Sequence, residues 1–185
     1  MQRLIHRWIS LPLCGLGLAA ALAADGAIDL NQSTLVATFK QQNAPVDAAF
    51  KKFSGSIVYD AAKPAATVAT LSVDMNSLDV GDDDTDAEVR KPAWFDSARY
   101  PEATFRATKI APGANGRFEA SGPLTIKGRT QTVTAAVTVQ RNGGATVFDG
   151  SLELSRKAFG IGDPAWEGVL DDAVRVRFHL RVAGP

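Results

Sequence analysis

The chain has 185 residues, of which 45% are hydrophobic and 22% are charged, and its 20 basic and 20 acidic side chains give a formal net charge of zero. This length suits one globular domain with a substantial core. A balanced charge does not favour a polyanion, so we expect no nucleic-acid partner.

Residues 1–23 are predicted to be a cleaved signal peptide. Arg3 and Arg7 precede an apolar run from Trp8 to Leu22, and small residues stand at 21 and 23. The run is short for a membrane span, so we expect export to the periplasm and a single domain over residues 24–185. An uncleaved anchor is the alternative.

Export limits the chemistry of the mature chain. The single cysteine, Cys14, lies within the predicted leader, and His179 is the one histidine after it. We therefore expect no disulfide, no thiolate nucleophile and no metal site, and no cofactor other than a bound lipid.

Eight segments alternate between apolar and polar residues, which is typical of half-buried antiparallel strands. In the last of them, from Val174 to Val182, every even position is apolar and every odd one is Arg or His. The predicted strands cover residues 34–41, 50–59, 68–75, 104–110, 117–126, 130–140, 146–155 and 174–182. We expect turns or short loops at 42–47, 127–129 and 142–144.

The acidic segment 79–96 differs from the rest and predicts a short helix between the third and fourth strands. An Asp cluster before a helical run stabilises its positive end. A calcium loop is the alternative, since Asp82, Asp84 and Asp86 match the first ligands of an EF-hand. Ala87 and Ala93 stand where that loop needs Gly and a bidentate Glu, which disfavours it.

Sequential strands with short connections predict an all-β fold, an eight-stranded antiparallel up-and-down barrel. In it, strand 174–182 closes against strand 34–41; a two-sheet sandwich is the alternative. The inward register carries no charged residue but several small ones, including Ala37, Gly55, Ala69 and Gly150. They either fit a tapered, filled barrel or leave a lumen for an apolar ligand, and both readings stay open.

A lumen without charges favours a long linear lipid over a small metabolite. Each buried methylene contributes about 0.8 kcal/mol, whereas association costs roughly 4–15 kcal/mol. A chain of about twenty carbons or more offsets that cost by burial alone.

The chain resembles the YceI-like family of exported lipid- or polyisoprenoid-binding proteins. The resemblance spans roughly residues 28–182. It rests on the segments Phe50-Lys-Lys-Phe-Ser-Gly-Ser-Ile-Val-Tyr-Asp60, Trp94-Phe-Asp-Ser-Ala-Arg-Tyr-Pro-Glu-Ala-Thr-Phe105, Gly122-Pro-Leu-Thr-Ile-Lys-Gly128 and Phe159-Gly-Ile-Gly162. It implies a lipocalin-like eight-stranded barrel with an isoprenoid chain in its lumen.

The predicted ligand-binding residues are inward-facing apolar side chains and large aromatics in loops. The strand positions are Phe39, Phe53, Ile57, Leu71, Val73, Met75, Phe105, Phe118, Phe148, Leu152, Val176 and Phe178. The loop positions are Trp94, Phe95, Phe159 and Trp166, which either line a mouth or plug an end of the barrel.

No catalytic residue is predicted. His179 falls on the polar face of its strand between Arg177 and Arg181, a poor position for a general base. The arginines are expected to face Asp149, Ser151 and Glu153 on the preceding strand. The adjacent Asp171 and Asp172 point apart and make a weak acid–base pair. We expect a protein that is not an enzyme.

Two functions remain. The first is a periplasmic carrier that binds a long apolar lipid, of isoprenoid or isoprenoid-quinone type, in the lumen. The second is an interaction module that docks through its aromatic loops onto a membrane redox protein. Transient contact with a membrane or membrane protein is compatible with either, as is a homodimer.

Overall fold

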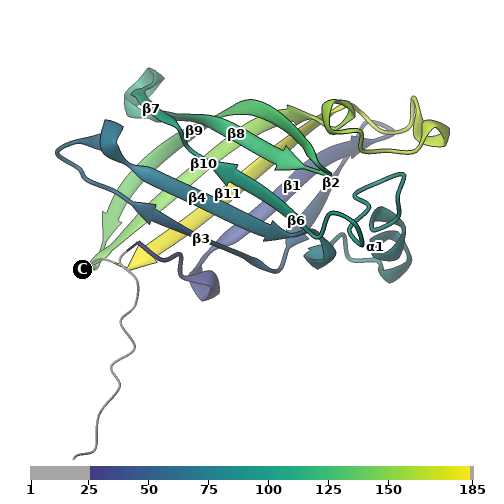
Figure 1. The fold of residues 1–185 in the computed structure, drawn as a ribbon, viewed down its shortest axis with the longest axis horizontal. Helices are drawn as coiled ribbons and strands as arrows, with labels where there is room; N and C mark the ends of the chain where they lie inside the picture. The colour runs from purple at the N-terminus through teal and green to yellow at the C-terminus, as the bar shows by residue number, and fades with distance from the viewer. Residues whose placement is uncertain (1–25, 184–185) are drawn as a thin grey trace, which may run out of the picture.

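The computed structural model describes residues 26–183, so the predicted signal peptide lies outside the described residues. They form one curved antiparallel sheet with a single α-helix at one end (Figure 1). The strands are β1 (Thr34–Gln41), β2 (Ala44–Phe50), β3 (Phe53–Val58), β4 (Val68–Asp74), β5 (Leu78–Asp79), β6 (Glu102–Arg106), β7 (Lys109–Pro112), β8 (Phe118–Ile126), β9 (Arg129–Asn142), β10 (Ala145–Ser155) and β11 (Ala173–Ala183). The helices are α1 (Asp83–Val89) and the 3₁₀ turns η1 (Leu30–Gln32), η2 (Pro64–Ala66), η3 (Met75–Ser77), η4 (Ala114–Gly116), η5 (Lys157–Phe159) and η6 (Pro164–Trp166).

The sheet curls around an apolar interior. Neighbouring strands follow the order β3-β4-β6-β8-β9-β10-β11-β1-β2-β5, and β7 pairs with β8. β1 and β11 pair antiparallel from Thr34 opposite His179 to Thr38 opposite Arg175. The prediction that the last strand closes against the first is therefore confirmed.

A short N-terminal segment joins β3 to β11. The Ile28 amide donates to the Gly55 carbonyl at 3.2 Å, and the Asp29 amide donates to the Arg181 carbonyl at 2.7 Å. The Ile57 amide donates back to Gly26 at 2.7 Å. This segment covers part of the β3 edge, which would otherwise present unpaired backbone groups.

The expected loop over residues 42–47 is wrong, because only two residues turn. Gln42 and Asn43 have φ angles of 50° and 65°, which make a tight hairpin, and β2 starts at the next residue. Pro45 and Asp47 suggested a loop. The strand tolerates Pro45 because β2 pairs with β5 only at its far end, so the missing N–H faces an open edge.

The expected count of eight strands is also too low, since the structure has eleven. Besides β2, the two-residue β5 is too short to leave a sequence pattern. The predicted strand 104–110 divides into β6 and β7. At the break, the Ala107 amide donates to Ala69 on one side, and the Thr108 amide donates to Ser121 on the other. The segment changes its neighbouring strand at this point, but apolar and polar residues continue to alternate along it. The sequence therefore gives no sign of the break.

The predicted helix is confirmed as α1, and its acidic residues cap it. The Asp82 carboxylate accepts from the Thr85 amide at 2.8 Å, and three further Asp residues occupy the first turn. Within residues 26–183, no group of three or more His, Cys, Asp or Glu side chains is arranged to hold a metal ion. No helix in the same range has the length and apolar character needed to cross a membrane.

Candidate ligand-binding cavity

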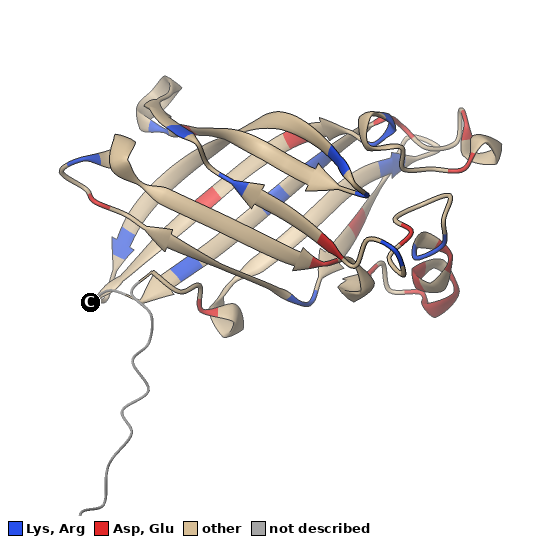
Figure 2. Cartoon of the chain, viewed as in Figure 1, with Lys and Arg blue, Asp and Glu red and all other residues tan. Residues whose placement is uncertain are grey.

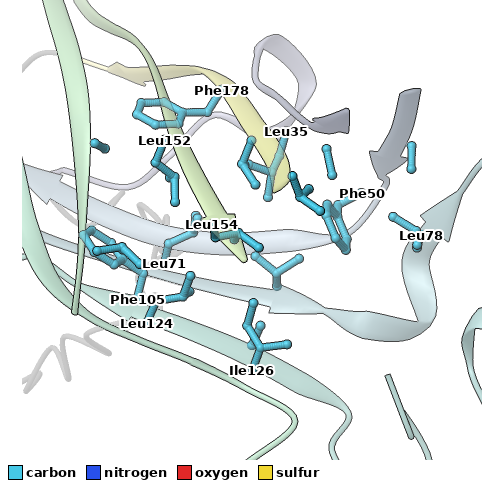
Figure 3. Close-up of a pocket in the computed structure, with 18 of the residues that line it drawn as sticks. Leu35, Phe50, Leu71, Leu78, Phe105, Leu124, Ile126, Leu152, Leu154 and Phe178 are labelled. Atoms are coloured by element: carbon cyan, nitrogen blue, oxygen red, sulfur yellow. The ribbon is translucent and has the colours of Figure 1, made fainter. Parts of the chain in front are cut away.

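A cavity of about 510 Å³ lies inside the curved sheet. Leu71 of β4, Phe105 of β6, Leu152 of β10 and Phe178 of β11 point into it from opposite walls (Figure 3). These four side chains are inward-facing yet only half-buried. Close-packed interiors rarely leave apolar side chains exposed in this way. Of the two readings left open by the sequence, the hollow lumen is therefore the one observed.

The small inward residues divide into two groups. A Cβ on Gly55 would lie 2.2 Å from the Thr70 carbonyl oxygen, and one on Gly150 would lie 2.3 Å from the Phe178 ring. At these two positions a neighbouring group already fills the space that a side chain would need, so only glycine fits. Ala37 and Ala69 are half-buried and line the cavity, so their small size leaves it room.

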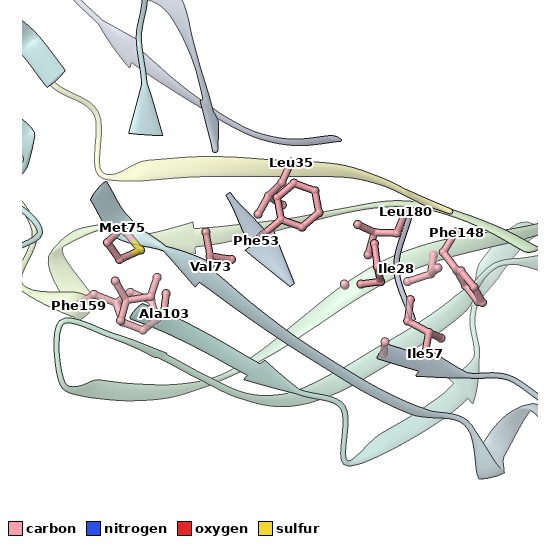
Figure 4. Packing of buried hydrophobic residues seen from close by; sticks show 14 of the residues in the cluster. Ile28, Leu35, Phe53, Ile57, Val73, Met75, Ala103, Phe148, Phe159 and Leu180 are labelled. Atoms are coloured by element: carbon pink, nitrogen blue, oxygen red, sulfur yellow. The ribbon is translucent and has the colours of Figure 1, made fainter. Parts of the chain in front are cut away.

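Fourteen of the sixteen predicted ligand-binding residues line the cavity. They are Phe39, Ile57, Leu71, Val73, Met75, Trp94, Phe95, Phe105, Phe118, Phe148, Leu152, Trp166, Val176 and Phe178. The other two, Phe53 and Phe159, are 8% and 1% exposed and belong to the packed core instead (Figure 4). Whether the fourteen contact a ligand remains a prediction.

Sequence reasoning missed part of the wall. Phe50 and Leu78, which lie opposite each other in the β2–β5 pair, both line the cavity. Phe50 is out of phase with Phe53 because the exposed Lys51 and Lys52 interrupt the alternation between β2 and β3. The two consecutive lysines, which break the alternation of apolar and polar residues, were the sequence feature that could have revealed Phe50 as part of the wall.

One end of the cavity, here called the α1 end, is formed by α1 and by the loops over residues 90–101 and 156–172 (Figure 1). The Lys127 ammonium ties these loops together by donating to the carbonyls of Pro92 at 2.7 Å and Gly160 at 2.8 Å. Burial lowers the pKa of Lys127. The Gly162 amide adds a 3.0 Å bond to the Ala93 carbonyl.

Arg156 is the buried centre of the α1 end, with 7% of its surface exposed. Its guanidinium donates to three backbone carbonyls, those of Asp171 at 2.9 Å, Ile161 at 2.9 Å and Leu170 at 3.0 Å. Gly162, at φ 123°, is required beside it, since a Cβ there would approach the Arg156 Nη1 to 2.1 Å. This cation fixes the loop that leads into β11.

The charged side chains that line the cavity lie at its α1 end. Among the described residues, the charged side chains that line the cavity are Asp84, Glu88, Arg156 and Asp171. Figure 2 shows a group of acidic residues on α1. Glu88 accepts from the Trp94 indole at 3.3 Å, and its hydrogen bond from the Lys91 ammonium holds the pKa of Glu88 below its usual value. An anionic ligand group would meet repulsion from this rim.

The opposite end, here called the η2 end, is formed by the β3–β4 connection with η2 and by β7. Tyr59 and Thr67 both line the cavity there, and the Tyr59 ring packs edge-on against Phe148 with centroids 5.6 Å apart. The Thr67 hydroxyl is buried without a hydrogen-bond partner among the described residues. A buried unpartnered hydroxyl costs about 1–3 kcal/mol.

Known proteins share this arrangement. The model of the YceI-like domain matches residues 27–182. The chain belongs to the YceI-like family. A UPF0312 protein of Vibrio cholerae is 32% identical over 155 residues, which cover 77% of this chain and 80% of the relative. A UPF0312 protein of Azotobacter vinelandii is 29% identical, covering 79% and 81%.

Two solved structures extend the comparison. BcnA of Burkholderia cenocepacia superposes on this YceI-like chain with a TM-score of 0.81 and 40% identity, covering 84% of this chain and 99% of BcnA. A polyisoprenoid binding domain from Saccharophagus degradans gives a TM-score of 0.70 at 20% identity, covering 86% and 98%. The second likeness establishes the fold alone.

On the outer face of this YceI-like domain, charged side chains form ion pairs between neighbouring strands. His179 Nδ1 lies 2.6 Å from the Asp149 carboxylate on the outer face, away from the lumen, as the alternation predicted. Arg175 pairs with Glu153 at 2.6 Å as expected. Arg177 lies opposite Ser151 of β10, as expected, and its guanidinium also pairs with Asp47 of β2 at 2.9 Å.

The two adjacent aspartates have separate structural roles. The Asp172 carboxylate accepts from the Ser155 hydroxyl at 2.7 Å and from the Lys157 amide at 2.9 Å. Asp171 has an exposed side chain, and its carbonyl oxygen binds Arg156. Asp172 thus anchors the loop ends of the YceI-like domain through its side chain, and Asp171 does so through its backbone.

Proposed function

We propose that this YceI-like protein binds a long apolar lipid of isoprenoid type in its cavity and carries it in the periplasm. The observation that supports this is the half-buried apolar lining of the lumen. Side chains such as Leu71, Phe105 and Phe178 remain accessible inside the sheet. A chain-like apolar ligand would cover this surface and remove it from water.

The size of the cavity indicates the length of the ligand. An apolar cavity of about 150 Å³ holds one benzene molecule. A volume of about 510 Å³ therefore accommodates roughly three such units, or about 20 carbon atoms. Burying about 20 carbons contributes roughly 16 kcal/mol at about 0.8 kcal/mol each, which exceeds the association cost of about 4–15 kcal/mol. A longer chain would emerge at an end of the cavity.

Relatives and sequence support the two remaining parts of the proposal. One structural neighbour is described as a polyisoprenoid binding domain, which agrees with an isoprenoid chain in the same fold. The basic start and apolar run of residues 1–23 favour export. The fold places its ion pairs outside and its half-buried apolar lining inside, which supports a role as a carrier of one lipid molecule.

The alternative of docking through aromatic loops has less support. Trp94 and Phe159 are 6% and 1% exposed, and Phe95 and Trp166 are half-buried. Three of these four line the cavity. Aromatic residues that face inward offer little surface to a membrane redox protein.

Organic extraction of protein purified from its own host, followed by mass analysis, tests the proposal. We expect an apolar species in about equimolar amount, and we expect extracted protein to take up a polyprenol of about 20 carbons at one molecule per chain. Native mass spectrometry measures both stoichiometries. Protein that carries no lipid and fails to bind the added polyprenol would overturn the proposal.

A further inference from the structure

Two uncharged residues with hydroxyl groups, Tyr59 and Thr67, lie at the η2 end of the cavity. The β3–β4 ladder ends with Val58 opposite Val68, and Tyr59 directly follows Val58 while Thr67 directly precedes Val68. Both residues line the cavity. Because the two residues flank the last pair of one antiparallel ladder, they lie at the same end of the cavity, where one ligand group can be reached from both strands.

The Thr67 hydroxyl has no internal partner. Most polar side chains near the cavity are satisfied within the protein, as Thr85 is by Asp82 and Trp94 is by Glu88. Among the described residues, the Thr67 Oγ1 is the buried side-chain oxygen or nitrogen that lacks a hydrogen bond. Buried polar groups normally have a partner, and an oxygen-bearing ligand group at the η2 end would supply one.

The charges near Tyr59 and Thr67 determine which kind of ligand group can be buried beside them. The charged residues that line the described cavity all lie at the α1 end. At the η2 end, Asp60 and Lys63 are exposed, and the Asp60 carboxylate caps the Ala62 amide at 2.8 Å. Among the described residues, no charged side chain lines the cavity at this end, so a phosphate or carboxylate buried there would have no counter-ion in the lining, which is costly, whereas burying a neutral oxygen costs less.

We infer that the η2 end binds a neutral, oxygen-bearing group of the lumen ligand, a hydroxyl or carbonyl, through the hydroxyls of Thr67 and Tyr59. The inference rests on the proposed function and adds an orientation to it. The polar group lies at the η2 end, and the apolar tail extends toward Trp94 and Trp166 at the α1 end. Phosphorylated lipids of the same chain length are disfavoured at both ends.

Paired probes test the inference. The affinity of each probe is measured by displacement of a bound apolar dye. The probes are geranylgeraniol, its diphosphate and the corresponding 20-carbon hydrocarbon. With Thr67→Val, which keeps the side-chain shape, we expect the alcohol to bind about fivefold to tenfold more weakly and the hydrocarbon within about twofold of its original affinity. Tyr59→Phe keeps the ring against Phe148 and should act in the same direction. Thr134→Val, on the outer face beside Ser121, is the matched control and should change neither.

Tryptophan fluorescence tests the orientation. In the full chain with Trp8→Phe, the remaining tryptophans, Trp94 and Trp166, both lie at the α1 end. An alcohol brominated at its tail should quench them more strongly than one brominated next to the hydroxyl. The reverse order would overturn the inference.

The remaining outcomes separate the two proposals. Equal losses for alcohol and hydrocarbon in Thr67→Val, or diphosphate binding as tight as alcohol binding, would overturn the polar site and leave apolar binding intact. Failure of the hydrocarbon to bind the unmodified protein would contradict the proposed function itself.

Discussion

The indole rings of Trp94 and Trp166 meet edge to face with their centroids 6.0 Å apart. Trp94 follows α1 and is buried, whereas Trp166 belongs to η6 and is half-buried. Both line the cavity. The contact thus joins the two loops that form the α1 end, and a ligand passing this end must displace it.

Replacing Trp166 by Ala should speed ligand exchange. An edge-to-face pair is worth about 0.5–1.5 kcal/mol beyond its buried area, so we expect dissociation of a bound apolar dye to be about twofold to tenfold faster. Stopped-flow dilution measures the rate. Leu30→Ala removes an exposed side chain far from this end and should leave it unchanged. An unaltered rate in Trp166→Ala would show that ligands do not exchange at the α1 end.

Filling the lumen should abolish binding without unfolding the protein. Ala37 is half-buried and lines the cavity between Leu35 and Phe39. Ala37→Phe places a ring in that space, and we expect lipid affinity to fall by at least about tenfold while stability holds or rises, because an apolar cavity is being filled. Val36→Phe puts the same ring on the outer face of β1. If both variants bind lipid normally, the ligand does not occupy this part of the cavity.

Alternation along single strands was enough to predict most of the wall. Residues 174–182 show it most clearly, and β11 indeed places Val176 and Phe178 on the cavity and His179 outside. The same rule placed Leu71 and Leu152 correctly. A strand with one solvated face carries its orientation in its own sequence, because its period of two is fixed by backbone geometry.

Other features depend on distant neighbours and could not be predicted in the same way. The sequence leaves open whether Phe159 lines a mouth or plugs an end of the barrel, and the structure shows it almost fully buried in the core cluster. The hollow interior depends on how far opposite walls are separated, which no single strand encodes. Thr67 was overlooked, since a threonine before a strand is ordinary until its hydroxyl is found buried and unpartnered.

Removing the Arg156 guanidinium should destabilise the whole α1 end. Arg156→Met keeps an apolar stem but leaves one buried and two part-buried carbonyls without their donor, and we expect a loss of about 2–4 kcal/mol in the free energy of unfolding. Arg156→Lys should rescue only part of it, because an ammonium cannot reproduce the guanidinium fork. Urea denaturation measures both variants.

The matched control for that experiment lies on the outer face. Arg175 pairs with Glu153, and both side chains are more than half exposed. Arg175→Met should therefore cost less than about 1 kcal/mol. Equal losses at the two arginines would mean that the three carbonyl contacts contribute nothing specific.

The Asp172 carboxylate should make stability fall in acid. Burial acts to raise its pKa, but the hydrogen bonds from the Lys157 amide and the Ser155 hydroxyl, together with the nearby Arg156 charge, outweigh burial and hold the pKa of Asp172 below its usual value. A lowered pKa in the folded state means that the stabilising contribution is fully present above the usual value. It is lost as the pH falls through the folded-state pKa.

Asp172→Asn tests this dependence directly. At neutral pH the variant should be less stable by on the order of 1 kcal/mol, and the difference should shrink below about pH 4 as the wild-type carboxylate takes up its proton. Urea denaturation at a series of pH values follows the difference, with Glu119→Gln on the exposed face of β8 as the control for removing one negative charge. A difference that stayed constant from pH 7 down to about pH 2 would mean that Asp172 stabilises the α1 end through its shape and not through its charge.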